Sequence, residues 1–306
     1  MLAAAVQLSA GADPERNLAA GVAAVREAAD RGATFVVLPE KWLAIGGADE
    51  LGAAAQVLGG PVVEQLGALA KELRIDLIAG SISERAGGHG SGGLRLVDGG
   101  ARAAGTVAAP EGADTRLHNT SLHFTPDGQL VAAYRKVHLF DADVSGRRYR
   151  ESDAERHGRE PVVSRLGGDP SFTAGLAICF DLRFPDLFRA LVTGGANVIT
   201  LPSAFTERTT RDHWEVLVRA RAIELGTFVV AANQCGEHPD GSRSGGGSLI
   251  VDPWGRVLAR AAEDRPEIVM AHLDRGLVDV SRDALPVLDL RRPDVYERPV
   301  GDGLRG

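Results

Sequence analysis

Short, predominantly apolar runs alternate with helix-like segments along this chain, and this alternation limits the folds that it can adopt. Leu2–Leu8 and Thr34–Leu38 are such runs, which predicts strands buried on both faces. Between them, Asp13-Pro14 has the pattern of a helix N-cap followed by proline at the first helical position. Apolar residues then recur at helical spacing to about Asp30. Strands covered on both faces, with a helix between them, predict an α/β fold.

The same order of strand, helix and strand recurs in both halves of the chain. Helices are predicted at 61–73, 185–193, 211–225 and 274–282, and strands at 75–82, 173–178, 197–201 and 228–232. Antiparallel strands are predicted at 94–97, 117–124 and 130–137, and a hairpin at 248–260. Since no linker or repeat divides the chain, it is interpreted as one domain with a mixed sheet, helices outside and an extended C-terminal tail.

Composition and charge exclude several classes of protein. A net charge of −7 over 306 residues provides no electrostatic attraction to nucleic acid or to an anionic membrane surface. No apolar stretch approaches the ~20 residues that span a bilayer, and Leu2–Leu8 is too short for a signal peptide. The two cysteines, Cys179 and Cys235, form neither a disulfide framework nor a zinc motif. We therefore expect a cytoplasmic enzyme, whose pocket can still be locally positive for an anionic substrate.

Three segments place reactive side chains just beyond predicted buried strands, where open α/β sheets bind their ligands. In the first, Glu40 follows an apolar strand and Pro39. A carboxylate there is expected to be partly buried, which suits a general base. In the second, Lys136 shares one strand face with Tyr134 and His138, where an ammonium group is suited to stabilise an oxyanion.

The third segment carries Cys179 at the end of an apolar strand, before a turn into a helix. This is the arrangement of a nucleophile elbow, in which backbone N–H groups after the nucleophile receive an oxyanion. A helix N-terminus also lowers the pKa of a thiol. His138 and His213 are candidates for a Cys–His pair, but neither has a papain-like signature. Taken singly, the three residues also fit a loop-capping glutamate, a solvated lysine and an inert core cysteine.

Together, the three segments resemble the catalytic motifs of the nitrilase, or carbon–nitrogen hydrolase, superfamily. The matching runs are LPE at 38–40, YRKVHLFD at 134–141 and ICFDLRFPDLF at 178–188. Further runs match at 201–206, 213–224, 229–238 and 246–255. The resemblance covers residues 1–275 and lies closest to the Nit subfamily, nearer to its deaminated glutathione amidase branch than to its omega-amidase branch.

The resemblance implies a Glu–Lys–Cys catalytic triad. By motif, Glu40 is the general base, Lys136 the positive partner of the developing oxyanion and Cys179 the nucleophile. The backbone N–H of Phe180 completes the oxyanion hole. Glu151 corresponds to the family's second glutamate, which helps to hold the site. No metal and no organic cofactor is required.

The resemblance also implies where the substrate binds. Arg183 corresponds to a position suited to a substrate carboxylate, the structural alternative being a pair with Asp181. Phe205 and Thr206 are assigned to the same pocket. Lys41 departs from the family, in which small or aromatic residues often follow the glutamate.

The implied fold is a four-layer α–β–β–α sandwich that pairs into a dimer or a larger homo-oligomer. On this basis we expect the hydrolase domain over residues 1–275. A C-terminal extension over residues 276–306 is expected to pack on the domain or on a neighbouring subunit.

The expected function is an amidase that hydrolyses a small carboxylate-bearing amide, resembling deaminated glutathione, through a cysteine thioester and with release of ammonia. The alternatives are an omega-amidase for 2-oxo-dicarboxylic monoamides, a nitrilase, an N-carbamoyl-amine hydrolase, or an inactive relative used as a scaffold. A nucleotide-binding protein is disfavoured, because the glycine-rich segment Ala86–Gly93 lacks the spacing of a phosphate loop.

Overall fold

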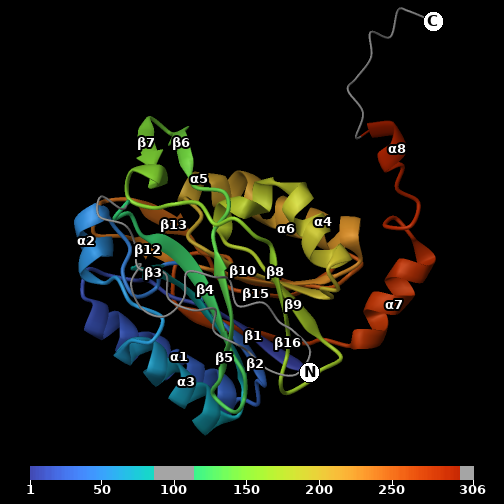
Figure 1. Ribbon diagram of the computed structural model, residues 1–306, viewed down its shortest axis with the longest axis horizontal. Coiled ribbons are helices and arrows are strands. Elements are labelled where there is room, and N and C mark those ends of the chain that lie inside the picture. The colour runs from blue at the N-terminus through green and yellow to red at the C-terminus, as the bar shows by residue number, and fades with distance from the viewer. Residues whose placement is uncertain (86–113, 297–306) are drawn as a thin grey trace, which may run out of the picture.

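The computed structural model describes residues 1–85 and 114–296, which form four layers in the order helix, sheet, sheet, helix (Figure 1). The expected α–β–β–α sandwich is therefore confirmed. The interpretation as one mixed sheet is wrong, because the strands divide into two six-stranded sheets. The predicted strand 94–97 and the segment Ala86–Gly93 lie outside the described residues.

The first sheet has the strand order β16–β1–β2–β3–β4–β5. Its strands are β1 (Leu2–Gln7), β2 (Phe35–Val37), β3 (Asp76–Glu84), β4 (His118–Phe124), β5 (Leu130–Arg135) and β16 (Glu267–His272). β1, β2 and β3 run parallel, and the other three pair antiparallel with their neighbours. Helices α1 (Pro14–Asp30) and α3 (Pro61–Leu73) cover its outer face.

The second sheet has the strand order β15–β14–β11–β10–β9–β8. Its strands are β8 (Val162–Arg165), β9 (Thr173–Leu176), β10 (Val198–Ser203), β11 (Phe228–Asn233), β14 (Leu249–Val251) and β15 (Val257–Arg260). β9, β10 and β11 run parallel. Helices α4 (Pro185–Thr193) and α6 (Glu215–Leu225) cover its outer face. The helix predicted from residue 211 starts later, because the chain enters α6 through a π-helical turn, Thr210–Trp214.

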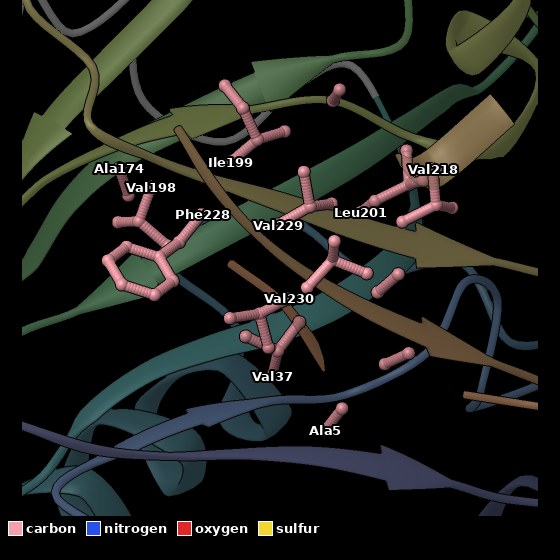
Figure 2. Packing of buried hydrophobic residues seen from close by; sticks show 14 of the residues in the cluster. Ala5, Val37, Ala174, Val198, Ile199, Leu201, Val218, Phe228, Val229 and Val230 are labelled. Carbon is pink, nitrogen blue, oxygen red and sulfur yellow. The ribbon is translucent and has the colours of Figure 1, made fainter. Parts of the chain in front are cut away.

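Apolar side chains from both sheets form the central core. Figure 2 shows Val37 of β2 beside Val230 of β11, whereas Val229 points toward Val218 of α6. One face of β11 therefore packs on the other sheet and its opposite face packs on a helix. This explains why the strand is apolar at successive positions without alternation.

A buried polar bridge also joins the two sheets. His123 on β4 contacts Ser164 Oγ on β8 at 2.7 Å and Asp76 Oδ1 on β3 at 3.1 Å. Asp76 accepts further hydrogen bonds from the N–H groups of Gly167 and Gly168, at 2.7 and 2.8 Å. Although these side chains are a serine, a histidine and an aspartate, they are at most 1% exposed. No substrate reaches them, and their role is to satisfy one another inside the sandwich.

Short elements extend from the ends of the sheets. They are α2 (Ala48–Ala53), β6 (Asp141–Val144), β7 (Arg147–Arg150), α5 (Glu207–Thr209), β12 (Cys235–Glu237) and β13 (Arg243–Gly245). β6 pairs with β7 and β12 pairs with β13 as separate hairpins. In Figure 1 the β6–β7 hairpin projects beyond the body of the sandwich.

The C-terminal elements are α7 (Arg275–Ala284) and α8 (Pro293–Tyr296). α7 begins at the N-cap Asp274, as predicted, and buries Val278 completely. Arg282 Nη2 donates to the carbonyl oxygen of Ala196 at 3.1 Å, which ties α7 to the body of the domain. α8 lies away from that body (Figure 1). Within residues 1–85 and 114–296, no helix is both long and apolar enough to cross a bilayer.

Candidate active site

Cys179 lies where the chain leaves β9 and enters a 3-10 helix, Cys179–Arg183. Its φ angle is 47°, in the left-handed region that side chains other than glycine rarely adopt. The side chain is 8% exposed and lines a cavity. The sharp turn that the sequence predicts is therefore present, with a 3-10 helix where an α-helix was expected.

The same turn leaves backbone donors unused at its start. The N–H of Asp181 donates to the carbonyl oxygen of Ile178 at 3.0 Å. The amides of Cys179 and Phe180 precede this first bond, and N–H groups at such a position have no acceptor within the helix. The Phe180 amide is thus suited to receive an oxyanion.

Glu40 follows β2 and is 3% exposed. Glycine at position 80 permits this placement, because a Cβ there would lie 2.0 Å from the carbonyl oxygen of Pro39. The Glu40 carbonyl oxygen accepts from Gln234 Nε2 at 3.0 Å, and its carboxylate accepts from the Ala204 N–H at 2.9 Å. Segments that follow β10 and β11 of the second sheet therefore hold Glu40, one at its carboxylate and one at its backbone.

Lys136 follows β5 and joins two carboxylates. Its Nζ lies 2.8 Å from Glu40 Oε1 and 2.8 Å from Glu151 Oε2. Asn119, which the sequence analysis missed, donates from Nδ2 to Glu40 Oε1 at 2.8 Å and to Glu151 Oε1 at 3.2 Å. Lys136 and Asn119 together hold the two carboxylates at a fixed separation.

A second buried cation lies behind Glu151. Lys41 Nζ is 2.9 Å from Glu151 Oε1 and 3.0 Å from Glu155 Oε2. The Lys41 backbone has a φ of 49°, and its N–H donates to Ser81 Oγ at 3.1 Å. The sequence signal for this contact was the unusual lysine after the glutamate, whereas no local pattern marked Glu155.

Burial and neighbouring charges together set the pKa values of Lys136 and Cys179. Burial opposes the Lys136 ammonium, but the carboxylates of Glu151 and Glu40 outweigh it and hold the pKa of Lys136 well above its usual value. Burial, followed by the Glu40 charge, raises the pKa of the Cys179 thiol well above its usual value. The lowered thiol pKa expected from the sequence is wrong, because desolvation and the Glu40 charge disfavour the thiolate more than the Lys136 ammonium favours it.

The histidine candidates contact other groups. His138 Nδ1 lies 2.7 Å from Asp181 Oδ1, and Asp181 Oδ2 accepts from Tyr134 Oη at 2.7 Å. His213 Nδ1 lies 3.4 Å from Arg183 Nη1. In the contacts of the described residues, neither histidine pairs with the Cys179 thiol, whereas the Glu40 carboxylate lies beside it.

Glu40, Lys136 and Cys179 line one cavity of about 810 Å³. The β6–β7 hairpin forms one side of its outer part, and the segment that joins β12 to β13 forms another. The charged side chains of this rim are Arg147, Arg148, Arg150, Asp153, Asp240 and Arg243. Across the part of the chain that the structure describes, no group of three or more His, Cys, Asp or Glu side chains is arranged to hold a metal ion.

Of the three expected substrate-binding residues, the structure places one in the cavity lining and two outside it. Thr206 lines the cavity. The Arg183 guanidinium lies 5.8 Å from the centre of the Phe180 ring and 5.4 Å from that of Phe205, and neither Arg183 nor Phe205 is among the cavity-lining residues. Asp181 is held by Tyr134 and His138 and not by Arg183, so the alternative pair is absent from the described contacts.

This chain is similar to known proteins in sequence and in structure. The carbon–nitrogen hydrolase family matches residues 2–283. The deaminated glutathione amidase of Bos taurus is 36% identical over 301 residues, which cover 96% of this chain and 83% of that protein. The chloroplastic omega-amidase of Arabidopsis thaliana is 33% identical, over 95% of this chain and 72% of that protein. Nit3 of Saccharomyces cerevisiae, a member of branch 10 of the nitrilase superfamily, has a TM-score of 0.77 at 27% identity, over 97% of both chains.

Proposed function

This chain belongs to the carbon–nitrogen hydrolase family and hydrolyses carbon–nitrogen bonds other than peptide bonds, and we propose that its substrate is a small amide that carries a carboxylate. The observation that supports this proposal best is the convergence of Glu40, Lys136 and Cys179 on one cavity. The named activities of the similar amidases agree with it.

In the proposed first half-reaction, the Cys179 sulfur attacks the amide carbonyl carbon while Glu40 accepts the thiol proton. The oxyanion is bound by the Lys136 ammonium and by the Phe180 N–H. One such donor is worth about 10²–10³ in rate. Glu40 then returns the proton to the leaving nitrogen, the C–N bond breaks, and a thioester remains on Cys179.

In the proposed second half-reaction, Glu40 accepts a proton from water as the water oxygen attacks the thioester carbonyl. Collapse of this second oxyanion releases the acid and returns the proton to the sulfur. Glu151 supports both steps by holding the Lys136 ammonium in place. Because the pKa of the Cys179 thiol is raised, proton transfer to Glu40 accompanies the attack, and a preformed thiolate is not needed.

The rim of the cavity supports a substrate with a carboxylate. Four arginines and two aspartates supply its charged side chains, so this region is locally positive on a chain with a net charge of −7. A positive rim attracts and orients an anionic substrate. Arg183, Phe205 and Thr206 are proposed to contact the substrate nearer to Cys179.

The leaving group distinguishes the two leading substrate classes. A primary amide, such as a 2-oxo-dicarboxylic monoamide, releases ammonia on hydrolysis. The amides of a deaminated peptide are secondary and release an amine. Release of ammonia, the product expected from the sequence, therefore fits the omega-amidase alternative, and an amine product fits the deaminated-glutathione class.

The test combines product analysis with trapping of the thioester. Purified protein is incubated with a deaminated glutathione and with 2-oxoglutaramate, and ammonia and amine are measured separately. Mass spectrometry of protein quenched during turnover is expected to show the acyl group on Cys179. Cys179→Ala is expected to lose turnover by at least about 10³-fold while keeping the wild-type circular dichroism spectrum.

Cys235→Ala is the matched control, since Cys235 is the other free and buried cysteine and is not among the cavity-lining residues. An acyl group on Cys235, or near-normal turnover by Cys179→Ala, would refute the assignment of the nucleophile. A chain with an intact fold that hydrolyses neither substrate and resists alkylation at Cys179 would favour the scaffold alternative.

We further propose that the protein works as a homo-oligomer in the cytoplasm. Residues 1–275 carry the hydrolase domain, and residues 276–306 form an extension that contacts a neighbouring copy. Exposed apolar side chains on this extension support the contact. Two free thiols, one of them the proposed nucleophile, suit a reducing compartment.

A further inference from the structure

We propose that Lys41 and Glu155 form a positioning pair for the catalytic cluster, in which Glu155 holds a proton at neutral pH and, with Lys41, keeps Glu151 ionised as the acceptor for Lys136. The inference rests on the proposed amidase function and deepens it. Glu155 acts through Glu151 and contacts no reacting atom, so it is a positioning residue.

The surroundings of Glu155 do not suit a carboxylate. Both of its carboxyl oxygens are buried and, among the described residues, no donor makes a hydrogen bond to them. Its one close cation is Lys41 at 3.0 Å, and Glu151 shares that cation at 2.9 Å. An ionised carboxylate that is fully buried, and whose single close cation is shared with a second carboxylate, is strongly disfavoured.

The other two carboxylates of the cluster have the donors that Glu155 lacks. Glu40 accepts from Lys136, Asn119 and the Ala204 N–H. Glu151 accepts from the same two side chains, and in addition from Lys41 at 2.9 Å and from the Phe140 N–H at 2.6 Å. Donors of this kind stabilise the ionised form of a carboxyl group.

The charges of the cluster then balance. Glu40, Glu151 and Glu155 face two ammonium groups, Lys41 and Lys136. With all five ionised the buried cluster has one excess negative charge, and one proton on the carboxyl group with the fewest donors removes it. Burial, and after it the neighbouring Glu151 charge, outweighs Lys41 and Lys136 and raises the pKa of Glu155 to about 8.

The proton gives Glu155 a donor to direct at Glu151. When Glu155 ionises, its charge repels Glu151 and competes with it for Lys41. Glu151 then holds the Lys136 ammonium less firmly, and the proposed oxyanion site loses its fixed geometry. We therefore expect kcat to fall as the pH rises through about 8, with little change in KM.

The experiment compares Glu155→Gln with the wild type. Glutamine is uncharged at every pH and keeps an N–H donor for Glu151, so the variant is expected to retain kcat within about twofold at pH 7 and to lose the alkaline fall. Lys41→Met, which leaves Glu155 without its cation and Glu151 with Lys136 alone, is expected to lower kcat by about 10²-fold through misplacement of the site. Glu84→Gln is the matched control, since it removes another buried carboxylate, paired with Arg135, and is expected to change stability alone.

Infrared difference spectra between pH 6 and pH 10 give a readout that does not depend on turnover. The wild type is expected to lose the carbonyl band of a protonated carboxyl group near pH 8, and Glu155→Gln is expected to lack that band. An identical alkaline fall and an identical band in Glu155→Gln would overturn the inference, as would wild-type kcat in folded Lys41→Met. A wild type that shows the band but hydrolyses no amide would refute the proposed function and leave the proton on Glu155 in place.

Discussion

Two of the residues that line the candidate site have left-handed backbone conformations. Cys179 has a φ of 47° and Lys41 a φ of 49°, and neither is glycine. Such conformations carry a strain that the surrounding structure must compensate, and they concentrate at functional sites. Here the left-handed backbone conformation turns the Cys179 thiol into the cavity and directs the Lys41 ammonium to Glu151.

Asn119 gives a test at the scale of one side chain, because it binds both carboxylates of the cluster. Asn119→Leu preserves the approximate volume but removes the donor, so Glu40 and Glu151 lose their common partner. We expect kcat to fall by about 10²-fold with a smaller change in KM. Steady-state kinetics on the preferred amide measures both.

Asn197→Leu is the control for the loss of a buried asparagine. Asn197 is 5% exposed and donates to the carbonyl oxygen of Ser171 at 2.9 Å, outside the cavity. This variant is expected to unfold more easily and to keep its kcat. Equal kinetic effects of the two substitutions would show that Asn119 acts through stability alone.

Single residues differed in how well the sequence predicted them. Glu40 and Cys179 follow predicted strands and Lys136 lies at the end of one, all within recognisable motifs, and the structure brings these three to one cavity. Asn119 lies inside β4 and Glu155 just after a 3-10 turn, where nothing local distinguishes them from ordinary polar residues. Their importance comes from partners that lie far away in the chain. Local patterns in a single sequence do not reveal such partners.

At the scale of elements, the bridge through His123 gives a test of how the two sheets are joined. His123→Leu removes the side-chain partner of Ser164 and one of the three hydrogen-bond partners of Asp76, at a site that is fully buried. Leaving buried polar groups without partners costs about 1–3 kcal/mol, and more for a charged one. We expect the free energy of unfolding to fall by about 2–4 kcal/mol, measured by urea denaturation.

His157→Leu is the matched control, since its Nδ1 contacts only the Val137 carbonyl oxygen in an exposed position. This substitution is expected to change the free energy of unfolding by less than about 0.5 kcal/mol. If both histidine variants were equally stable, the bridge would contribute nothing to the packing of the sheets.

Elements with strong apolar patterns were predicted well, and polar ones were not. β1, β10 and β11 are apolar because each is covered on both faces. The β6–β7 hairpin has the sequences DADV and RRYR, which lack the apolar alternation of a half-buried strand. Its pairing depends on the position of the hairpin beside the cavity. The rim of the site was therefore missed, although Glu40, Lys136 and Cys179 at its centre were predicted.

At the scale of the whole molecule, the proton on Glu155 makes folding pH-dependent. The pKa of this group rises from 4.5 to about 8 on folding, so the folded state binds the proton more tightly than the unfolded state. Its contribution to stability is complete below about pH 4.5 and is lost as the pH rises through about 8. We expect Glu155→Gln to gain stability relative to the wild type over this interval, as measured by urea denaturation at several pH values. A difference that does not vary with pH would contradict this assignment.

The division into two sheets is also a property of the whole molecule. Local patterns predicted all the strands of the two sheets except β16 in the first and β8 in the second, but the pairing partners of β3 and β9 are set by packing between layers. The family resemblance supplied the sandwich that the residue patterns alone had merged into one sheet. The boundary at residue 275 remains a proposal; the family match extends to residue 283, which includes most of α7.

The C-terminal extension gives the last test. Its apolar side chains Leu285, Val287, Leu290, Val295 and Tyr296 are between 49% and 72% exposed. Several exposed large apolar side chains within one short segment suit a contact between subunits. α7 is held independently by Val278 and Arg282, so a chain that ends at Ala284 is expected to fold.

We expect light scattering to give the wild type a mass of two or more copies of the 32.1 kDa chain, and the shortened chain fewer copies of its own, lower mass. The circular dichroism spectrum should differ only by the loss of the extension. Since Glu40, Lys136 and Cys179 all lie before residue 275, the shortened chain should keep its kcat wherever the cavity is complete within one copy. An unchanged mass would place the subunit contact elsewhere on the domain, and a lower kcat after the loss of assembly would mean that a neighbouring copy completes the site.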